Sequence, residues 1–245
     1  MTATFLWALA GTQFLLFMTA LGAALVFVFP GGRRPRAQAL LLGFAGGVMS
    51  AAAVWSLLLP AIEQAGAAER GPSWLPAAAG LLLGGAFLAL VEGWEKGAAG
   101  KERMLFTAIT LHNIPEGMAV GLAFALAGRG GEGLAAAFTL ALGVGVQNFP
   151  EGAAVALPLR QSGLGRGRAF LWGALSGAVE PVFGMAAFLL AAAVRPAMPW
   201  LLGFSAGAML YVTVRELSPA AAEGGGSFGY LGGFALMMVL DVSLG

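Results

Sequence analysis

A six-residue pattern that occurs twice, each time inside a long apolar stretch, constrains this chain more than any other feature. The sequence HNIPEG at 112–117 is followed 35 residues later by QNFPEG at 147–152. In each copy a residue that can bind a metal ion precedes a glutamate by four positions, so a helix places both on one face. Carboxylates, an imidazole and helix-kinking prolines are costly inside a membrane unless they are satisfied. The repeat therefore favours a transition-metal site within a lipid bilayer.

The composition is that of a polytopic membrane protein. Hydrophobic residues make up 59% of the chain and charged residues only 10%, whereas soluble domains carry about 25% charged residues. No basic tail or charge cluster suggests a nucleic-acid partner. The chain has no cysteine, which excludes disulfides and thiolate metal sites. The first apolar stretch has no positively charged leader, so we expect a permanent helix and not a cleaved signal.

Eight apolar stretches are long enough to cross a bilayer as helices, which takes about 20 residues. We therefore expect an all-α polytopic membrane protein in which residues 1–245 form a single integral membrane domain. The expected spans are 5–29, 39–62, 75–94, 105–127, 133–158, 169–194, 199–221 and 228–244.

The distribution of Lys and Arg predicts the orientation of these spans, because cytoplasmic loops carry an excess of both. The loops after spans one, three and five contain nine of them, and the loops after spans two, four and six contain three. Both termini are therefore expected on the non-cytoplasmic side. The nine are Arg33, Arg34, Arg36, Lys96, Lys101, Arg103, Arg160, Arg166 and Arg168, and the three are Arg70, Arg129 and Arg195.

A second repeat relates the second span to the seventh. LLGFAGGVM at 41–49 matches LLGFSAGAM at 201–209, and a proline follows in both, at Pro60 and Pro219. With the orientation above, the two copies are inverted. The chain then divides into three helices (about 5–94), two central helices (about 105–158) and three helices (about 169–244), and such inverted repeats often enclose a transporter's substrate site. The alternative is that LLGF is a common glycine-rich packing motif.

Six side chains are predicted at one depth, roughly 10–16 Å from the cytoplasmic edge, from the rise of about 1.5 Å per helical residue. Nitrogen and oxygen ligands suit Zn²⁺, Fe²⁺ or Mn²⁺, and a thioether favours the softer metals. The three glutamates together would carry three negative charges, so a lone divalent ion requires a bound proton or a second cation beside it. These side chains are Met49, His112, Glu116, Gln147, Glu151 and Glu180.

Several of these residues have alternative interpretations when taken singly. His112 could be an interhelical hydrogen-bond donor, Met49 a packing residue and Gln147 a structural amide. Pro115 cannot donate a helical hydrogen bond and frees a carbonyl one turn earlier, and the proline of the second copy does the same. Asn113 and Asn148 could bind these carbonyls or bind metal.

Four polar residues near the ends of spans have simpler interpretations. Arg215 and Glu216, near the cytoplasmic end of their span, could form an interfacial ion pair or extend to the interface. Glu216 could also guide the exit of a cation from the site. Glu63 is either a solvated helix end or an attraction for entering cations. Asp241 is expected close to the outer interface, without a functional role.

The motifs at this point resemble the ZIP (Zrt/Irt-like) family of divalent-metal transporters, and in particular its bacterial GufA-like branch. The patterns at 112–117 and 147–152 are similar to the family's hallmark motifs in its fourth and fifth helices, and SGAVEP at 176–181 is similar to one in the sixth. Met49 with WSLLLP at 55–60, and MMVLDV at 237–242, extend the resemblance over nearly the whole chain.

The resemblance implies eight helices in a three-plus-two-plus-three order, both termini outside, and metal movement into the cytoplasm of a bacterium across its inner membrane. It implies an elevator-like movement of helices one, four, five and six, a homodimer, and zinc as the expected substrate, with Cd²⁺, Fe²⁺ and Mn²⁺ as alternatives and no cofactor. The implied primary site is Met49, His112, Glu116, Gln147 and Glu151, and a second position adds Asn113, Asn148 and Glu180. Ser56 and Glu63 would line the outer approach.

Three departures from the family pattern stand in this sequence. Asn148 replaces an acid found in some relatives, which weakens the second position. The connection between the third and fourth helices contains no histidine, and Arg215 stands where relatives often have histidine or an acid. Two other functions compete: a membrane-embedded metal-dependent enzyme that activates water with the same ligands, and a metal sensor or scaffold. The first would require further acid–base groups, and the second would require soluble domains.

Overall fold

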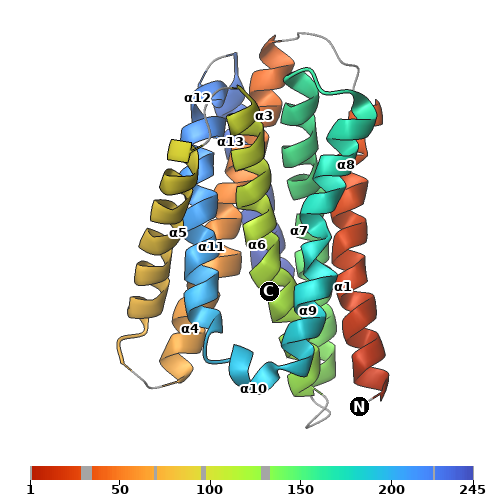
Figure 1. Ribbon diagram of the computed structural model, residues 1–245, viewed down its shortest axis with the longest axis vertical. Helices are drawn as coiled ribbons and strands as arrows, with labels where there is room; N and C mark the ends of the chain where they lie inside the picture. Colours follow the sequence, from red (N-terminus) through yellow and green to blue (C-terminus); the bar gives the residue numbers. More distant parts are fainter. Residues whose placement is uncertain are drawn as a thin grey trace.

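The computed structural model describes residues 2–28, 35–68, 71–94, 98–127, 133–222 and 224–244, and these residues are helical apart from short turns (Figure 1). The expected all-α class is therefore confirmed. The helices are α1 (Thr2–Ala23), α2 (Leu25–Val28), α3 (Pro35–Ala52), η1 (Ala53–Leu58), α4 (Leu59–Ala67), α5 (Trp74–Trp94), α6 (Ala98–Ala127), α7 (Gly133–Gln161), α8 (Arg166–Gly177), α9 (Val179–Leu189), α10 (Ala191–Val194), α11 (Met198–Val212), η2 (Thr213–Leu217), α12 (Ser218–Ala221) and α13 (Gly226–Leu244).

Six of these helical segments are long and apolar enough to cross a membrane. The other two expected spans are helical as well, as α6 and as the run from α11 to α12. They are the less apolar ones because α6 carries His112 and Glu116 and the other carries Arg215 and Glu216. A count of eight spans therefore remains a prediction. The six segments are Ala3–Val28, Ala39–Ala67, Trp74–Gly93, Gly133–Gln161, Arg166–Leu189 and Gly226–Ser243.

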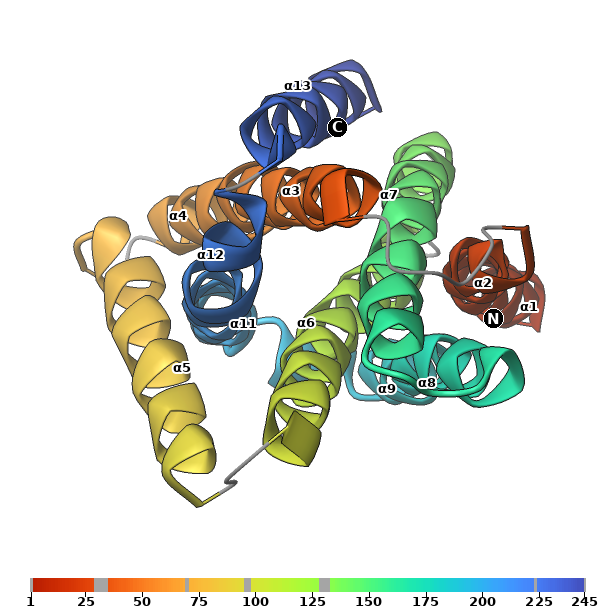
Figure 2. The ribbon, with the colours of Figure 1, turned by 90° about the horizontal axis from the view of Figure 1, so that it is seen from above.

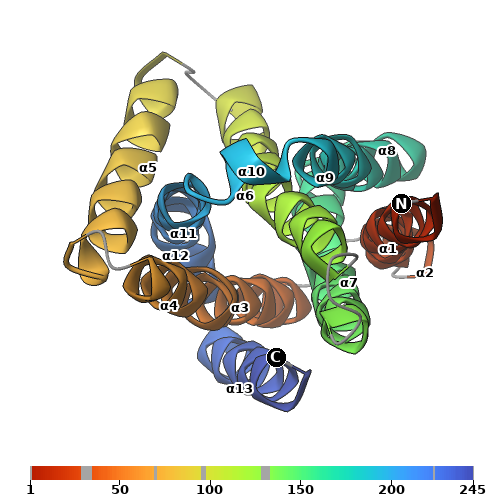
Figure 3. The same ribbon diagram turned by 90° about the horizontal axis from the view of Figure 1, so that it is seen from below.

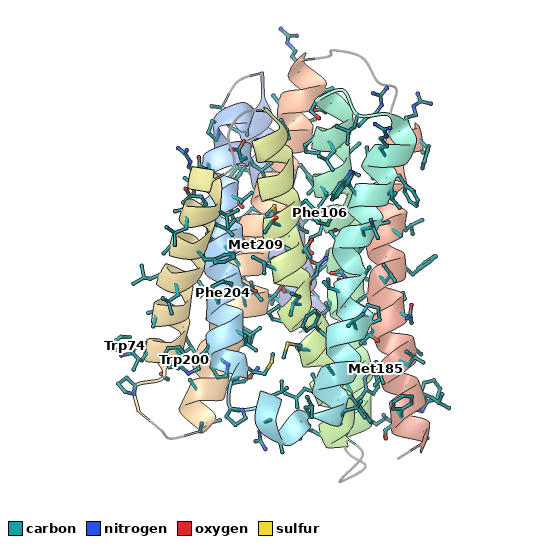
Figure 4. All side chains as sticks on the ribbon, viewed as in Figure 1. Trp74, Phe106, Met185, Trp200, Phe204 and Met209 are labelled. Atoms are coloured by element: carbon teal, nitrogen blue, oxygen red, sulfur yellow. The ribbon has the colours of Figure 1, made fainter. Side chains whose placement is uncertain are left out.

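The outer surface of the bundle is apolar, as a lipid-facing surface should be. Leu82 is 71% exposed and Leu90 63% exposed on α5, and Phe228 on α13 is 79% exposed. Trp74 and Trp200 lie near the same end of the bundle (Figure 4). Trp74 is 59% exposed and Trp200 44% exposed, in keeping with the aromatic residues that gather at a membrane–water interface.

The helices form two groups that meet along α6 and α7 (Figure 2). In the first group, α1 packs along α7 and α9 along α6; in the second, α13 packs along α3 and α5 along α11. Seen from below, α10 links α9 to α11 beneath α6 (Figure 3). We call these the α7 group (α1, α6, α7, α8, α9) and the α3 group (α3, α4, α5, α11, α12, α13).

The α3 group contains the same close helix contact twice. A Cβ atom on Gly84 of α5 would lie 1.9 Å from the carbonyl oxygen of Phe204, and one on Gly233 of α13 would lie 2.1 Å from that of Phe44. Phe44 and Phe204 occupy matching positions in the repeated LLGF sequence. Only glycine permits such an approach of two backbones, so the repeated sequence forms a repeated packing arrangement.

Several interruptions in the helices were not expected from the sequence, and three of them precede a proline. The π-helices η1 and η2 occur at matching places, shortly before Pro60 and Pro219. Because proline cannot donate to the preceding turn, a local widening of the helix accommodates it. The expected span 169–194 also divides at Ala178, three residues before Pro181, and this separates α8 from α9.

Candidate metal centre

Three potential metal ligands come together in the interior, where α6 faces α7. The Nε2 atom of His112 lies 3.0 Å from Oε1 of Glu116 and 3.2 Å from Oε1 of Glu151. All three side chains are buried, and their ligand atoms lie within 4.8 Å of one another. Two ligands at 2.0–2.2 Å from a tetrahedral Zn²⁺ would be roughly 3.4 Å apart, so these separations fit a shared ion.

The hydrogen-bonding capacity of the cluster is largely unused. Both carboxylate oxygens of Glu116, Oε2 of Glu151 and Nδ1 of His112 have no hydrogen-bond partner among the described residues. Two buried carboxylates that share a single imidazole are unfavourable, because a protonated His112 balances at most one of their two negative charges. A divalent cation among these oxygens would satisfy them, so the donor set is chemically suited to a metal ion.

The local sequence explains how these helices carry the cluster. The i, i+4 spacing places His112 and Glu116 on one face of α6. Pro115 leaves the carbonyl of Leu111 without a donor in its own helix, and the hydroxyl of Ser205 on α11 donates to it at 2.9 Å. The suggestion that Asn113 binds such a freed carbonyl is therefore wrong for Leu111, because a serine from the α3 group supplies that bond.

A second polar set adjoins the first on the side of α9. The amide of Asn148 donates to Oε1 of Glu180 at 2.5 Å, and that of Asn113 donates to the carbonyl of Ser176 at 2.9 Å. Both amide oxygens and Oε2 of Glu180 lack hydrogen-bond partners among the described residues. Gly117 allows α9 to come this close, since a Cβ there would lie 2.4 Å from the carbonyl oxygen of Glu180.

A third set links Gln147 to the α3 group and corrects the placement of Asp241. The hydroxyl of Ser56 donates to Oδ1 of Asp241 at 2.7 Å, and the amide of Gln147 donates to the same oxygen. Asp241 also lines one cavity together with Glu116. Asp241 therefore belongs to the polar interior and not to the outer interface, where the sequence analysis placed it. A carboxylate in an apolar span was the signal that could have revealed it.

The remaining predicted site residues lie in different surroundings. Met49 is fully buried in the apolar core. Glu63 is exposed on α4, and Glu216 is half-buried in η2. Arg215 forms an ion pair with Glu92 on α5, an interhelical partner that the sequence analysis did not suggest.

Two adjoining cavities connect the cluster with one end of the bundle. The inner cavity, of about 180 Å³, is lined by Ser56, Glu116 and Gln147. The outer one, of about 760 Å³, reaches the start of α11 and is lined by Arg195 among others. Both are lined by Gln64, Ala119 and Leu140. Gln64, which the sequence analysis did not single out, therefore borders the approach where Glu63 was expected.

Comparison with known proteins gives matches to zinc transporters, in agreement with the buried cluster. Residues 99–241 match the family model of the ZIP zinc transporters. The chain is 42% identical to the zinc transporter GufA of Myxococcus xanthus, over 97% of this chain and 96% of that one. It is 36% identical to the zinc transporter ZIP11 of Bos taurus, over 97% of both, and 35% identical to the zinc transporter ZIPB of Bordetella bronchiseptica, over 93% of this chain and 78% of the other. The two Pro-Glu helices and the buried cluster thus belong to a member of the ZIP family, in its GufA-like branch.

Proposed function

We propose that this chain carries divalent transition-metal ions, zinc foremost, across a membrane and into the cytoplasm. The observation that carries the proposal is the buried cluster of His112, Glu116 and Glu151, whose spacing fits one ion and in which three of the four carboxylate oxygens accept no hydrogen bond among the described residues. The relatives named zinc transporters support zinc as the substrate. The ion is the cargo of the protein and not a resident cofactor.

The proposed ligand set is wider than the three clustered residues. Met49 and Gln147 complete a primary position around His112, Glu116 and Glu151. A second position uses Asn113, Asn148 and Glu180 and shares the two glutamates of the first. The unpartnered oxygens beside Glu180 support it, and a second cation there would balance the third carboxylate charge.

The proposed architecture is eight spans in a three-plus-two-plus-three order with an inverted repeat. The matched glycine contacts of Phe44 and Phe204, and the matched positions of η1 and η2, support it. We place the protein as a homodimer in a bacterial inner membrane with both termini on the non-cytoplasmic side. The Lys and Arg distribution supports this orientation.

Transport then requires the α7 group to move against the α3 group, as in an elevator. In the described arrangement, cavities approach Glu116 from the end where α11 begins. Three polar contacts cross at the boundary between the groups beside the cluster: Ser205 with the carbonyl of Leu111, Asp241 with Gln147, and Ser56 with Gln147. Movement breaks these contacts, so they favour the arrangement that is open at this end.

Initial-rate uptake of zinc into proteoliposomes tests the proposal. We expect saturable uptake by the wild type and its loss when Glu116→Gln and Glu151→Gln are combined, since the amides cannot supply anionic ligands. Thr12→Val is the matched control, because among the described residues its buried hydroxyl donates to carbonyls of its own helix, Ala8 and Leu9. Equal uptake by the wild type and the double variant would exclude this cluster as the transport site.

A further inference from the structure

An apolar groove runs along the seam between the two groups, on the side away from the metal cavities. It has a volume of about 340 Å³ and lies between α7 on one side and α3 and α13 on the other, with Leu25 of α2 at one end. It opens to the surroundings, because Leu236 of α13, which lines it, is 44% exposed. We propose that this groove binds one acyl chain of an anionic phospholipid.

The dimensions of the groove fit a hydrocarbon chain. Its lining on α7 extends from Val146 to Gln161, which is about 22 Å at 1.5 Å per residue. A volume of about 340 Å³ over that length makes the groove long and narrow, as an extended hydrocarbon chain requires.

The groove is the counterpart, by the internal repeat, of the large metal-side cavity. Of the eight residues of α7 that line the groove, four have a counterpart 35 positions earlier, on α6, that lines the cavity. The pairs are Ala119 with Ala154, Leu122 with Leu157, Ala123 with Pro158, and Leu126 with Gln161.

The two spaces nevertheless differ in chemistry. The cavity on the metal side includes Gln64 and Arg195 and leads toward Glu116. Phe149 and Pro150 line the groove, whereas their polar neighbours Asn148 and Glu151 do not. Gln161 is the one polar residue among the described residues that line it. An apolar space of this kind excludes water. Hydrocarbon is the available occupant within a bilayer.

The basic residues at the end of the groove indicate the headgroup. Gln161 ends α7 at the same end of the bundle where α3 and α8 begin (Figure 1). Arg36 and Arg168 are exposed at this end, and Arg160 precedes Gln161. The guanidinium of Arg160 donates to the carbonyl of Leu164, while its Nε has no partner among the described residues. Arginines at the bilayer surface attract anionic lipid headgroups.

Native mass spectrometry of the full chain tests the proposal. The probe is an equimolar mixture of phosphatidylglycerol and phosphatidylcholine with identical palmitoyl and oleoyl chains. We expect the wild type to retain phosphatidylglycerol, with a preference of roughly fivefold per contributing arginine. Arg36→Gln with Arg160→Gln should keep lipid binding and lose the preference, whereas Arg195→Gln, on the metal-side cavity, should behave as the wild type.

Variants that fill the groove test its location. Ala154→Phe places a ring inside it, and Leu236→Trp narrows its opening at a partly exposed position where folding is not at risk. Both should lose retained lipid several-fold, and Leu82→Trp on the lipid-facing side of α5 should not. Unchanged lipid retention in both groove variants would overturn the proposal. Loss of a dimer without loss of lipid would also overturn it, because the groove would then be a contact between copies.

Discussion

The hydrogen bond between Ser205 and the carbonyl of Leu111 makes a quantitative prediction about how this bundle is held together. Pro115 removes the helical donor for that carbonyl, and Ser205, only 1% exposed, replaces it from another helix at 2.9 Å. Ser205→Ala should therefore leave the partly buried carbonyl of Leu111 without this donor. This penalty is distinct from the loss of an ordinary side-chain hydrogen bond.

The magnitude follows from two bounds. An unsatisfied buried acceptor costs about 1–3 kcal/mol, while side-chain hydrogen bonds between membrane helices average about 0.6 and reach about 1.7 kcal/mol. We expect Ser205→Ala to lower the free energy of unfolding by about 1–1.7 kcal/mol. For a chain of this length that corresponds to a decrease of roughly 2–6 °C in the unfolding temperature.

A double-mutant cycle in detergent isolates the cause. In Pro115→Ala the new backbone N–H bonds the carbonyl of Leu111, so adding Ser205→Ala should cost less than about 0.5 kcal/mol. Thr213→Val is the control, on the helical run that continues from α11. The hydroxyl of Thr213 donates to the Met209 carbonyl, which already accepts a backbone N–H. Equal losses from Ser205→Ala in the wild type and in the Pro115→Ala variant would refute the reasoning.

Three further predictions address the approach to the site and the packing. Asp241→Ala removes the acceptor shared by Ser56 and Gln147. Losing about 1.4 kcal/mol of transition-state stabilisation lowers kcat/KM for zinc uptake roughly tenfold. An unchanged value would show that Asp241 does not contribute to the pathway. Gly84→Ala should unfold at lower temperature than the wild type, since its Cβ would meet the Phe204 backbone at 1.9 Å, whereas Gly232→Ala, with nothing within 4 Å, should be neutral or stabilising. Arg195→Gln should raise zinc uptake at about 10 mM salt and have little effect at about 1 M, where screening is nearly complete; an effect independent of salt would contradict an electrostatic cause.

The buried cluster of His112, Glu116 and Glu151 could be predicted from the sequence because short-range spacing determines most of it. The i, i+4 spacing in HNIPEG and the repeat of Pro-Glu placed His112, Glu116 and Glu151 on facing helices, and these residues meet in the structure. The helical segments also followed from apolar stretches of sufficient length.

The position of Asp241 could not be predicted by counting residues from a membrane edge. That count treats every helix as a straight span of full depth. The 19 residues of α13 reach only about 28 Å, and the C-terminus stands well above the lower ends of α4 and α7 (Figure 1). The last turn of α13 therefore lies beside Ser56, within the bundle.

Contacts between segments far apart in the sequence could not be predicted either. The replacement of the Leu111 helical bond by Ser205 depends on how α11 packs against α6, and no local pattern records that. The pairing of Arg215 with Glu92 depends in the same way on the packing of α5 against α11. Local spacing fixes which residues share a helix face, but tertiary packing selects their partners.

Anomalous diffraction at the zinc absorption edge, from crystals grown with Zn²⁺, tests the central claim most directly. We predict a peak about 2.0–2.2 Å from Nε2 of His112 and from carboxylate oxygens of Glu116 and Glu151, and its loss in the variant that combines Glu116→Gln and Glu151→Gln. A zinc peak elsewhere in the bundle, with none at this cluster, would contradict the account.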